Sequence, residues 1–396
     1  MNRSHSVLLL SSILLFALFA TTAQADRSSG LDRDARRELR DSDLNKYVGQ
    51  FEPATSEDVG NGWTKHTFDS EGGEGPICID GSDYTVFTRP GTHRKKTAVF
   101  LNGGGACWQD FYFCTPQADQ DPPADIGVFA PSYDTGSEII ENPLEKYSMV
   151  YASYCDGSVF AGDNSVVDPS SPFGPVRHHR GLRNLTAAMD LARDEFGRPK
   201  KLFLSGASAG GVGTATWAPL IARFVFGNKP RIKNFNDAGP VAALLIPIPP
   251  IVAAIEARAA DWQFEQFYPE SCTECSPFNQ ATEIVKWRLD RDNRIAEAFY
   301  STDQDTTNRF FLGGLDGPTY RAVLTTVHAD VNAAFPKTYK TFIRSGDNSH
   351  TALRFDRFYT ATANGVPLHE WTDDFLHGGR GRPGWTDIVE DFVPAP

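Results

Sequence analysis

The sequence predicts an α/β fold in which a mostly parallel central sheet is flanked by helices. Short apolar runs typical of buried strands alternate with helix-length segments along most of the chain. Strands separated by helices normally pair in parallel, and the helices between them then cover both faces of the sheet. No internal repeat and no long Pro/Ser linker divides the chain, so we expect residues 51–396 to form one large domain.

Apolar runs and helical periodicity locate the expected elements. Strand candidates occupy residues 97–101, 147–151, 202–204, 295–300 and 339–343. Apolar residues recur at helical spacing over 182–196, which Gly197 ends, and over 320–334. The apolar segment 216–226 is expected to continue the helix that begins after Ser208.

The N-terminal residues 1–25 resemble a signal peptide. Arg3 precedes an apolar run over residues 7–20, and Ala23-Gln24-Ala25 offers the small-x-small pattern that a signal peptidase accepts. The run is too short for a comfortable membrane span, and a signal anchor is the alternative. We therefore expect a secreted protein, extracellular or periplasmic. Residues 26–50 are polar, and we expect a loosely attached arm or a short surface helix there.

Charge and cysteine content narrow the partners and the compartment. The formal net charge of −12 opposes binding to nucleic acid, and the basic run Arg94-Lys95-Lys96 is short. We expect a monomer. Six cysteines behind an export signal indicate up to three disulfides, although spacing alone leaves their pairing open. Cys272-x-x-Cys275 is alternatively half a zinc site, but no second CxxC or suitably spaced His pair completes it.

The strongest local motif is Gly206-Ala207-Ser208-Ala209-Gly210, which follows the strand candidate at 202–204. A G-x-S-x-G sequence between a strand and a helix is the nucleophile elbow of α/β-hydrolases. The turn is so tight that the residues two before and two after the serine carry almost no side chain. The helix that follows directs the positive end of its dipole at the site. Ser208 is therefore the candidate nucleophile.

A nucleophilic serine needs a base and an orienting carboxylate, which follow it in the order acid, then histidine. His350 lies in a polar loop after the strand candidate 339–343, where such a histidine is expected, while His369 and His377 are later alternatives. Asp303 and Asp305 both follow the strand candidate 295–300, and position alone does not separate them.

The glycine run after residues 97–101 fits an oxyanion hole. Backbone N–H groups must meet the oxygen that becomes negative in the tetrahedral intermediate. Asn102-Gly103-Gly104-Gly105-Ala106 lets amides approach a substrate closely, and Ala209 follows the nucleophile. The competing interpretation, a phosphate-binding loop, lacks the Lys-Ser/Thr that a P-loop requires.

These motifs together resemble the pectin acetylesterase and Notum family of serine carboxylesterases. The resemblance extends over roughly residues 75 to 380. It is carried by Phe100 to Trp108, Gly206 to Gly213, Asn236-Asp237-Ala238-Gly239, Asp305-Thr306-Thr307-Asn308 and Asn348-Ser349-His350.

The resemblance implies Ser208, Asp305 and His350 as the catalytic triad, with no cofactor and no metal. It also implies oxyanion donors at Gly104, Gly105 and Ala209, and the disulfides Cys78–Cys155, Cys107–Cys114 and Cys272–Cys275. Two positions depart from the family. Asn308 stands where the family has Gln, and Gly105 stands where it usually has an aromatic residue.

The family resemblance implies acetyl esters on a polysaccharide such as pectin as the substrate. The uncharged segment from Val241 to Ile255 contains three prolines, which exclude a regular core helix through its middle. It is either a buried connection or a lid-like pocket wall over an apolar part of a substrate. The second interpretation favours a rival, lipase-like or deacylase activity on longer acyl esters. A non-catalytic carbohydrate-binding protein on a hydrolase scaffold is the alternative from another class.

Overall fold

The computed structural model describes residues 30–70, 72–240, 249–279, 282–378 and 385–395, and the expected signal peptide lies outside them. Across the described residues, ten strands form one sheet in the order β1-β2-β3-β9-β4-β12-β13-β14-β15-β18. These strands are β1 (Thr55–Gly60), β2 (Trp63–Phe68), β3 (Tyr84–Arg89), β9 (Ser148–Ala152), β4 (Lys96–Leu101), β12 (Lys201–Ala207), β13 (Arg231–Asp237), β14 (Ile295–Thr302), β15 (Tyr339–Arg344) and β18 (Ile388–Val389). Neighbours from β9 to β18 pair in parallel, whereas β1, β2, β3 and β9 pair antiparallel. The predicted mostly parallel α/β sheet is confirmed.

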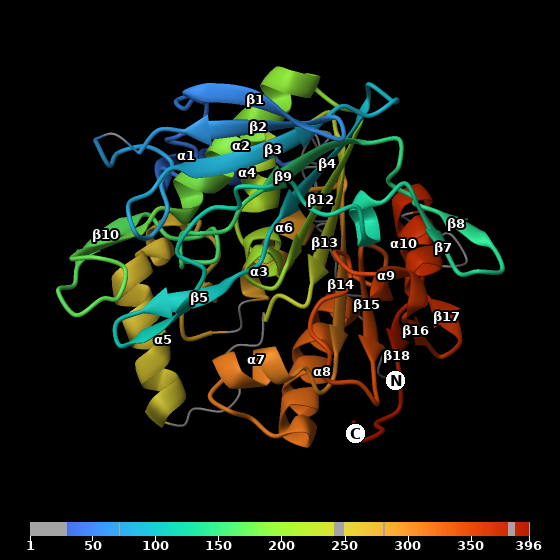
Figure 1. Cartoon of the computed structure of the whole chain (residues 1–396). Helices are drawn as coiled ribbons and strands as arrows, with labels where there is room; N and C mark the ends of the chain where they lie inside the picture. Colours follow the sequence, from blue (N-terminus) through green and yellow to red (C-terminus); the bar gives the residue numbers. More distant parts are fainter. Residues whose placement is uncertain (1–29, 71, 241–248, 280–281, 379–384, 396) are drawn as a thin grey trace, which may run out of the picture.

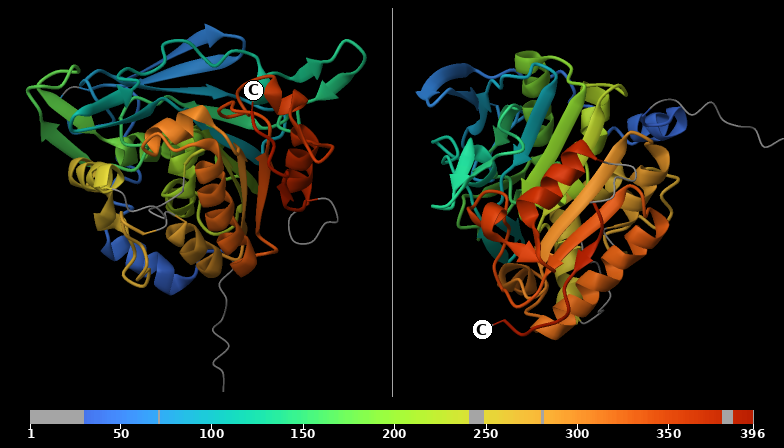
Figure 2. Two further views of the ribbon diagram at one scale, coloured as in Figure 1. Left: turned by 90° about the horizontal axis from the view of Figure 1, so that it is seen from below. Right: turned by 90° about the vertical axis from the view of Figure 1, so that its right-hand side faces the viewer.

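Helices cover both faces of this sheet (Figures 1 and 2). They are α1 (Arg33–Asp41), α2 (Gly181–Phe196), α3 (Ala209–Ala215), α4 (Ala218–Val225), α5 (Pro249–Trp262), α6 (Glu283–Arg291), α7 (Thr306–Phe311), α8 (Gly317–Ala334), α9 (Arg357–Thr360) and α10 (Leu368–His377), with short 3₁₀ turns at Gly127–Phe129 and Phe264–Phe267. Small hairpins lie outside the main sheet: β5 (Gly105–Trp108) with β6 (Phe111–Cys114), β7 (Ser132–Asp134) with β8 (Ile139–Glu141), β10 (Asn164–Val167) with β11 (Val176–His179), and β16 (Thr362–Ala363) with β17 (Val366–Pro367).

Alternating side chains of the strands feed two core clusters. In β4, Val99 and Leu101 pack in the cluster that contains the buried residues of α2, α4, α6 and α8. Ala98 and Phe100 pack in the other cluster, beneath α9 and α10. The two-residue period of a strand thus supplies both cores from a continuous apolar run, as expected for a sheet buried on both faces.

The segment after Ser208 differs from the prediction of one continuous helix. Helix α3 ends at Ala215, and α4 begins at Ala218 with Pro219 in its first turn. Proline lacks the N–H of the helical ladder, and its ring would clash with the carbonyl of Ala215 in an unbroken helix. The prediction was therefore wrong, because Pro219 starts a second helix instead of continuing the first.

A loose arm or a short surface helix was expected over residues 26–50, and the part of this segment that the structure describes, from residue 30, contains α1. Ala35 and Leu39 are buried in the core. Arg36 donates hydrogen bonds to the carbonyl of Arg223 (2.7 Å) and to Oδ1 of Asn228 (2.9 Å). This part of the chain is therefore packed against the sheet domain through its apolar face.

The segment Val241 to Ile255 is only partly described, since residues 241–248 lie outside the described ranges. Pro249 and Pro250 begin α5, where a missing N–H costs nothing because no helical partner exists there. The prolines therefore start a helix, which continues beyond the predicted segment to Trp262.

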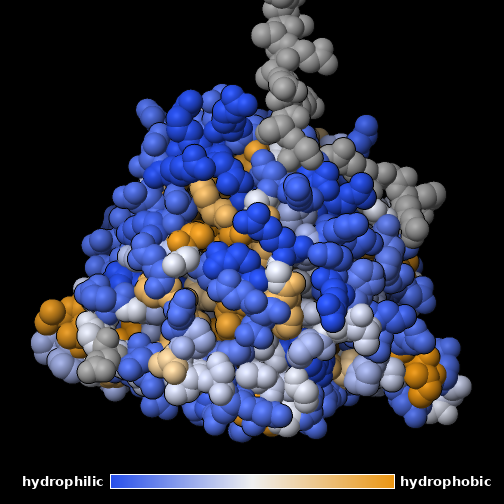
Figure 3. Space-filling view, turned by 90° about the horizontal axis from the view of Figure 1, so that it is seen from above, coloured by the Kyte–Doolittle hydropathy of each residue, from blue (hydrophilic) through white to orange (hydrophobic). Residues whose placement is uncertain are grey.

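The three disulfides implied by the family resemblance, Cys78–Cys155, Cys107–Cys114 and Cys272–Cys275, are all present among the described residues. The alternative of a zinc half-site at Cys272 and Cys275 is therefore wrong. None of the helices in the described part of the chain has the length and hydropathy needed to cross a bilayer. The face shown in Figure 3 is mostly hydrophilic, in keeping with the acidic composition.

Candidate active site

The strand-to-helix turn at Ser208 has the strained geometry of a nucleophile elbow. Ser208 adopts φ 56° and ψ −117° between the end of β12 and the start of α3. A Cβ atom on Gly210 would lie 2.0 Å from the carbonyl oxygen of Leu101, so only glycine fits there. The amide of Ser208 donates to the carbonyl of Asp237 at the end of β13 (2.9 Å), which fixes the turn to the neighbouring strand. Such backbone strain at a single residue is typical of functional sites.

Asp305 and His350 are joined across the ends of β14 and β15. The distance between Nδ1 of His350 and Oδ2 of Asp305 is 2.6 Å. Because a carboxylate only accepts, Nδ1 carries the proton and Nε2 is left as the acceptor. Asp305 also accepts the amide N–H of Asn308 (2.9 Å) as the N-cap of α7, which holds its carboxylate in place. The imidazole is thus fixed in the tautomer that can accept a proton at Nε2.

Asp303, the other candidate acid, faces elsewhere. Its carboxylate is fully buried and pairs with Arg321 of α8, while Gln304 donates to it at 3.2 Å. The structure therefore brings Asp305, and not Asp303, to His350.

The other histidines after Ser208 lie away from it. His328 is buried within α8, where Nδ1 bonds to the hydroxyl of Tyr339 (2.6 Å), and burial lowers the pKa of His328 to about 3. His369 and His377 line a separate polar hollow with Lys96 and several acidic residues.

Ser208 and His350 line one hollow at the carboxyl ends of the parallel strands, which we call the Ser208 hollow. It has a volume of about 480 Å³ and is lined by Gly103, Gly104, Gly105, Ala207, Ser208, Thr306, Thr307, Asn348, Ser349, His350, Thr351, Arg354, Phe355 and Arg357. Within the described residues, Nε2 of His350 has no hydrogen-bond partner, so no bond joins it to Ser208. Such contacts are often long before substrate binds.

The predicted oxyanion residues lie beside this hollow. Gly104 and Gly105 line it, and Ala209 is the first residue of α3, whose first-turn amides have no partner within the helix. Gly105 has φ +81°, and a Cβ atom there would lie 2.0 Å from the carbonyl oxygen of Phe113. The aromatic residue usual in the family would not fit this backbone, which accounts for the glycine.

Asp237 is a positioning residue to which sequence reasoning gave no role. Its buried carboxylate accepts the amide N–H groups of Ala352 (2.8 and 3.0 Å) and Leu353 (2.8 Å), which lie two and three residues after His350. Burial is the main cause that raises the pKa of Asp237 to about 6. The motif from Asn236 to Gly239 could have pointed to a role for Asp237. The contact itself was not predictable, because the two loops lie far apart in the sequence.

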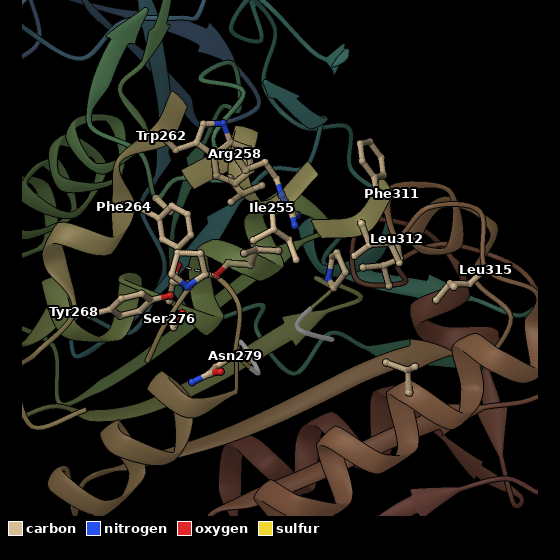
Figure 4. Close-up of a pocket in the computed structure, with 18 residues that line it drawn as sticks. Ile255, Arg258, Trp262, Phe264, Tyr268, Ser276, Asn279, Phe311, Leu312 and Leu315 are labelled. Atoms are coloured by element: carbon tan, nitrogen blue, oxygen red, sulfur yellow. Dashed lines mark hydrogen bonds between the residues drawn. The ribbon is translucent and has the colours of Figure 1, made fainter. Parts of the chain in front are cut away.

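A second cavity, which we call the α5 cavity, adjoins the other side of α3. It has a volume of about 140 Å³ and is lined mostly by apolar residues, among them Val212, Ile251, Ile255, Trp262, Phe311 and Leu312. Figure 4 shows α5 supplying one wall and the residues that end α7 supplying another. Ile251 and Ile255 make the described end of the Val241 to Ile255 segment a pocket wall, one of its two predicted interpretations.

Comparisons with known proteins agree with this architecture. Residues 63–242 match the family model described as Pectinacetylesterase. The solved structure of the Wnt deacylase Notum from Drosophila superposes with a TM-score of 0.59 at 16% sequence identity, covering 85% of this chain and 97% of that one. No curated protein matches the chain. The family resemblance and the fold expected from the sequence are confirmed.

Proposed function

We propose that this chain, whose residues 63–242 match the pectinacetylesterase family, is a secreted serine carboxylesterase that works through an acyl-enzyme. The observation that carries the proposal is the bond of 2.6 Å between Asp305 and His350, a residue that lines the same hollow as Ser208 and whose Nε2 has no partner among the described residues. The three disulfides and the expected signal peptide support secretion.

In the proposed mechanism, Nε2 of His350 takes the proton of the Ser208 hydroxyl as its oxygen attacks the ester carbonyl. Asp305 holds the imidazole and stabilises its positive form. The amides of Gly104, Gly105 and Ala209 bind the negative oxygen of the tetrahedral intermediate. The alcohol leaves with a proton from His350, and water activated by His350 then releases the acid from Ser208.

We propose acetyl esters on an acidic polysaccharide such as pectin as the substrate. The Ser208 hollow is wide, and polar side chains form much of its wall. Arg354 and Arg357 line it, and among the described residues they bond to neutral acceptors, Oδ1 of Asn102 and the carbonyl of His350, without a carboxylate partner. Two cations in a chain of net charge −12 favour a substrate that carries carboxylates near the ester.

A second candidate is hydrolysis of longer acyl esters. The specific observation in its favour is the apolar α5 cavity, which Val212 lines one helical turn after Ser208. The Drosophila structure is named as a deacylase, which supports an acyl group as substrate in this fold.

The test is hydrolysis of nitrophenyl acetate, butyrate and a long-chain ester by the mature protein and by Ser208→Ala. We expect rates to be highest with acetate and to fall by about 10⁴-fold or more in Ser208→Ala, since the nucleophile is lost. Ser137→Ala, in an exposed turn, serves as the matched control and should keep full activity.

Each other outcome has a stated meaning. Unchanged hydrolysis by Ser208→Ala would overturn the mechanism, and an optimum at the long-chain ester would favour the second candidate. If the wild-type protein hydrolyses neither these esters nor acetylated polygalacturonate, a carbohydrate-binding protein on a hydrolase scaffold becomes the better hypothesis.

A further inference from the structure

Among the described residues, the α5 cavity contains one positively charged side chain, that of Arg258, although most of its lining is apolar. Arg258 extends from α5 into the cavity and lies near the centre of the residues drawn in Figure 4. Ile255 and Trp262 of the same helix flank it, and Phe311 and Leu312 lie across from it. The Arg258 side chain is half-buried, and a guanidinium that is partly removed from water is stabilised by a partner of opposite charge.

Arg258 has few partners within the described residues. Its Nε donates to the carbonyl of Ala254 in its own helix (3.2 Å), and its guanidinium lies 5.3 Å from the ring centre of Trp108. A guanidinium has five N–H donors, so the Nη groups have no protein acceptor among the hydrogen bonds that the described residues form. Burial lowers the pKa of Arg258 to about 10, which leaves it charged at neutral pH.

The arginines that are fully buried in this protein have carboxylate partners. Arg177 pairs with Asp168 (2.8 Å) and Asp261 (2.7 Å). Arg223 pairs with Asp292, and Arg288 pairs with Glu297 (2.7 Å). A carboxylate therefore neutralises each of these three arginines within the core. Arg258 is half-buried, lines the α5 cavity and has no carboxylate partner among the described residues.

The size and the chemistry of the cavity define what would fit. An apolar cavity of about 150 Å³ holds a benzene ring in another protein, so the α5 cavity, at about 140 Å³, accepts a body of that size. A purely alkyl group would cover the guanidinium with CH₂ groups and leave its charge unpaired. A carboxylate would accept two N–H groups of Arg258 side by side, as planar guanidinium and carboxylate groups do.

We propose that the α5 cavity binds a small carboxylate with an apolar body, aromatic or medium-chain aliphatic, whose carboxylate pairs with Arg258. The apolar body lies against Ile255, Phe311 and Leu312. This proposal does not rest on the esterase function, because it concerns binding and not turnover.

The experiment measures binding by calorimetry in the Ser208→Ala background, where the proposed nucleophile is absent. The probes are trans-cinnamate and octanoate, each compared with its neutral alcohol, cinnamyl alcohol and octanol. We expect each carboxylate to bind at least ten-fold more tightly than its alcohol. Adding Arg258→Met should abolish this preference, whereas Arg258→Lys should keep part of it. Arg94→Met, which removes an exposed charge, is the matched control and should change nothing.

Equal binding of carboxylate and alcohol by the Ser208→Ala protein would overturn the proposal, and so would no binding of either. An unchanged preference for the carboxylate after Arg258→Met would also overturn it. If Arg258→Met fails to fold, the Arg258→Lys protein and the carboxylate-to-alcohol ratio still decide the question. Tighter binding of cinnamate than of octanoate identifies an aromatic ligand, and the reverse an aliphatic one. A failure of the esterase proposal would show instead as unchanged hydrolysis by Ser208→Ala, with carboxylate binding intact.

Discussion

The Ser208 hollow and the α5 cavity meet at one short helix and yet differ in how their polar groups are arranged. In the hollow, Asp305 holds His350 by a bond of 2.6 Å, and Asp237 holds the backbone that follows His350. In the α5 cavity, Arg258 is surrounded by apolar side chains and bonds only weakly within its own helix. In the functions that we propose, the first arrangement serves proton transfer, whereas the second takes its counter-charge from a bound ligand.

Asp305→Asn is expected to have the largest effect, because it should impair catalysis in the Ser208 hollow without changing binding in the α5 cavity. An amide at this position favours the wrong imidazole tautomer, so kcat for nitrophenyl acetate should fall by about 10⁴-fold. Cinnamate binding in the α5 cavity should not change. Steady-state kinetics and calorimetry on the same protein measure both.

Asp303→Asn is the matched control for this prediction, because Asp303 lies two residues away and pairs with Arg321. It should lower the melting temperature, since a buried ion pair is weakened, and leave kcat within a few-fold of the wild-type value. A larger loss of kcat in Asp303→Asn than in Asp305→Asn would reassign the acid.

The sequence predicted the hollow well and the cavity poorly, for a physical reason. Ser208 stands in a tight turn that few sequences can form, and His350 follows a recognisable strand, so short motifs identify them. Position along the chain did not separate Asp303 from Asp305, and only the family resemblance favoured Asp305. In the structure the two carboxylates differ because Asp303 pairs with Arg321 of α8.

The α5 cavity, by contrast, is built by residues from Val159 to Val323, which share no local pattern. The sequence alone therefore does not distinguish Arg258 from an ordinary surface arginine on a helix. The role of Asp237 was missed in the same way, since its partners Ala352 and Leu353 lie far along the chain.

An intermediate effect is expected from Gly105→Ala. The added Cβ atom would lie 2.0 Å from the carbonyl oxygen of Phe113, so the glycine loop must shift away from its place beside Ser208. Displacement of one oxyanion donor typically lowers kcat by about 10²–10³-fold. Gly136→Ala is the matched control, because Gly136 also has positive φ but nothing lies within 4 Å of an added Cβ atom. Equal activity of the Gly105→Ala and wild-type proteins would remove Gly105 from the oxyanion hole.

The smallest effect concerns Asp237, which holds the loop after His350, and it is measured as a change in the free energy of unfolding. The pKa of Asp237 is raised to about 6 from 3.8, mainly by burial, so the folded state takes up its proton at higher pH than the unfolded state does. Protonation of Asp237 therefore stabilises the folded protein progressively as pH falls from about 7 to about 4. Asp237→Asn cannot take up this proton. The free energy of unfolding of the wild-type protein minus that of Asp237→Asn should increase by about 1–3 kcal/mol over this pH range.

Denaturant titrations of both proteins at pH 7 and pH 4 measure this difference. A difference that stays constant or decreases toward pH 4 would show that Asp237 is not a carboxylate whose ionisation is opposed by burial. Carboxylate binding at Arg258 should be the same in both proteins at pH 7, because Asp237 supports the loop of His350 and does not line the α5 cavity. A change in that binding would mean that the two sites are coupled through α3, where Ser208 and Val212 stand one helical turn apart.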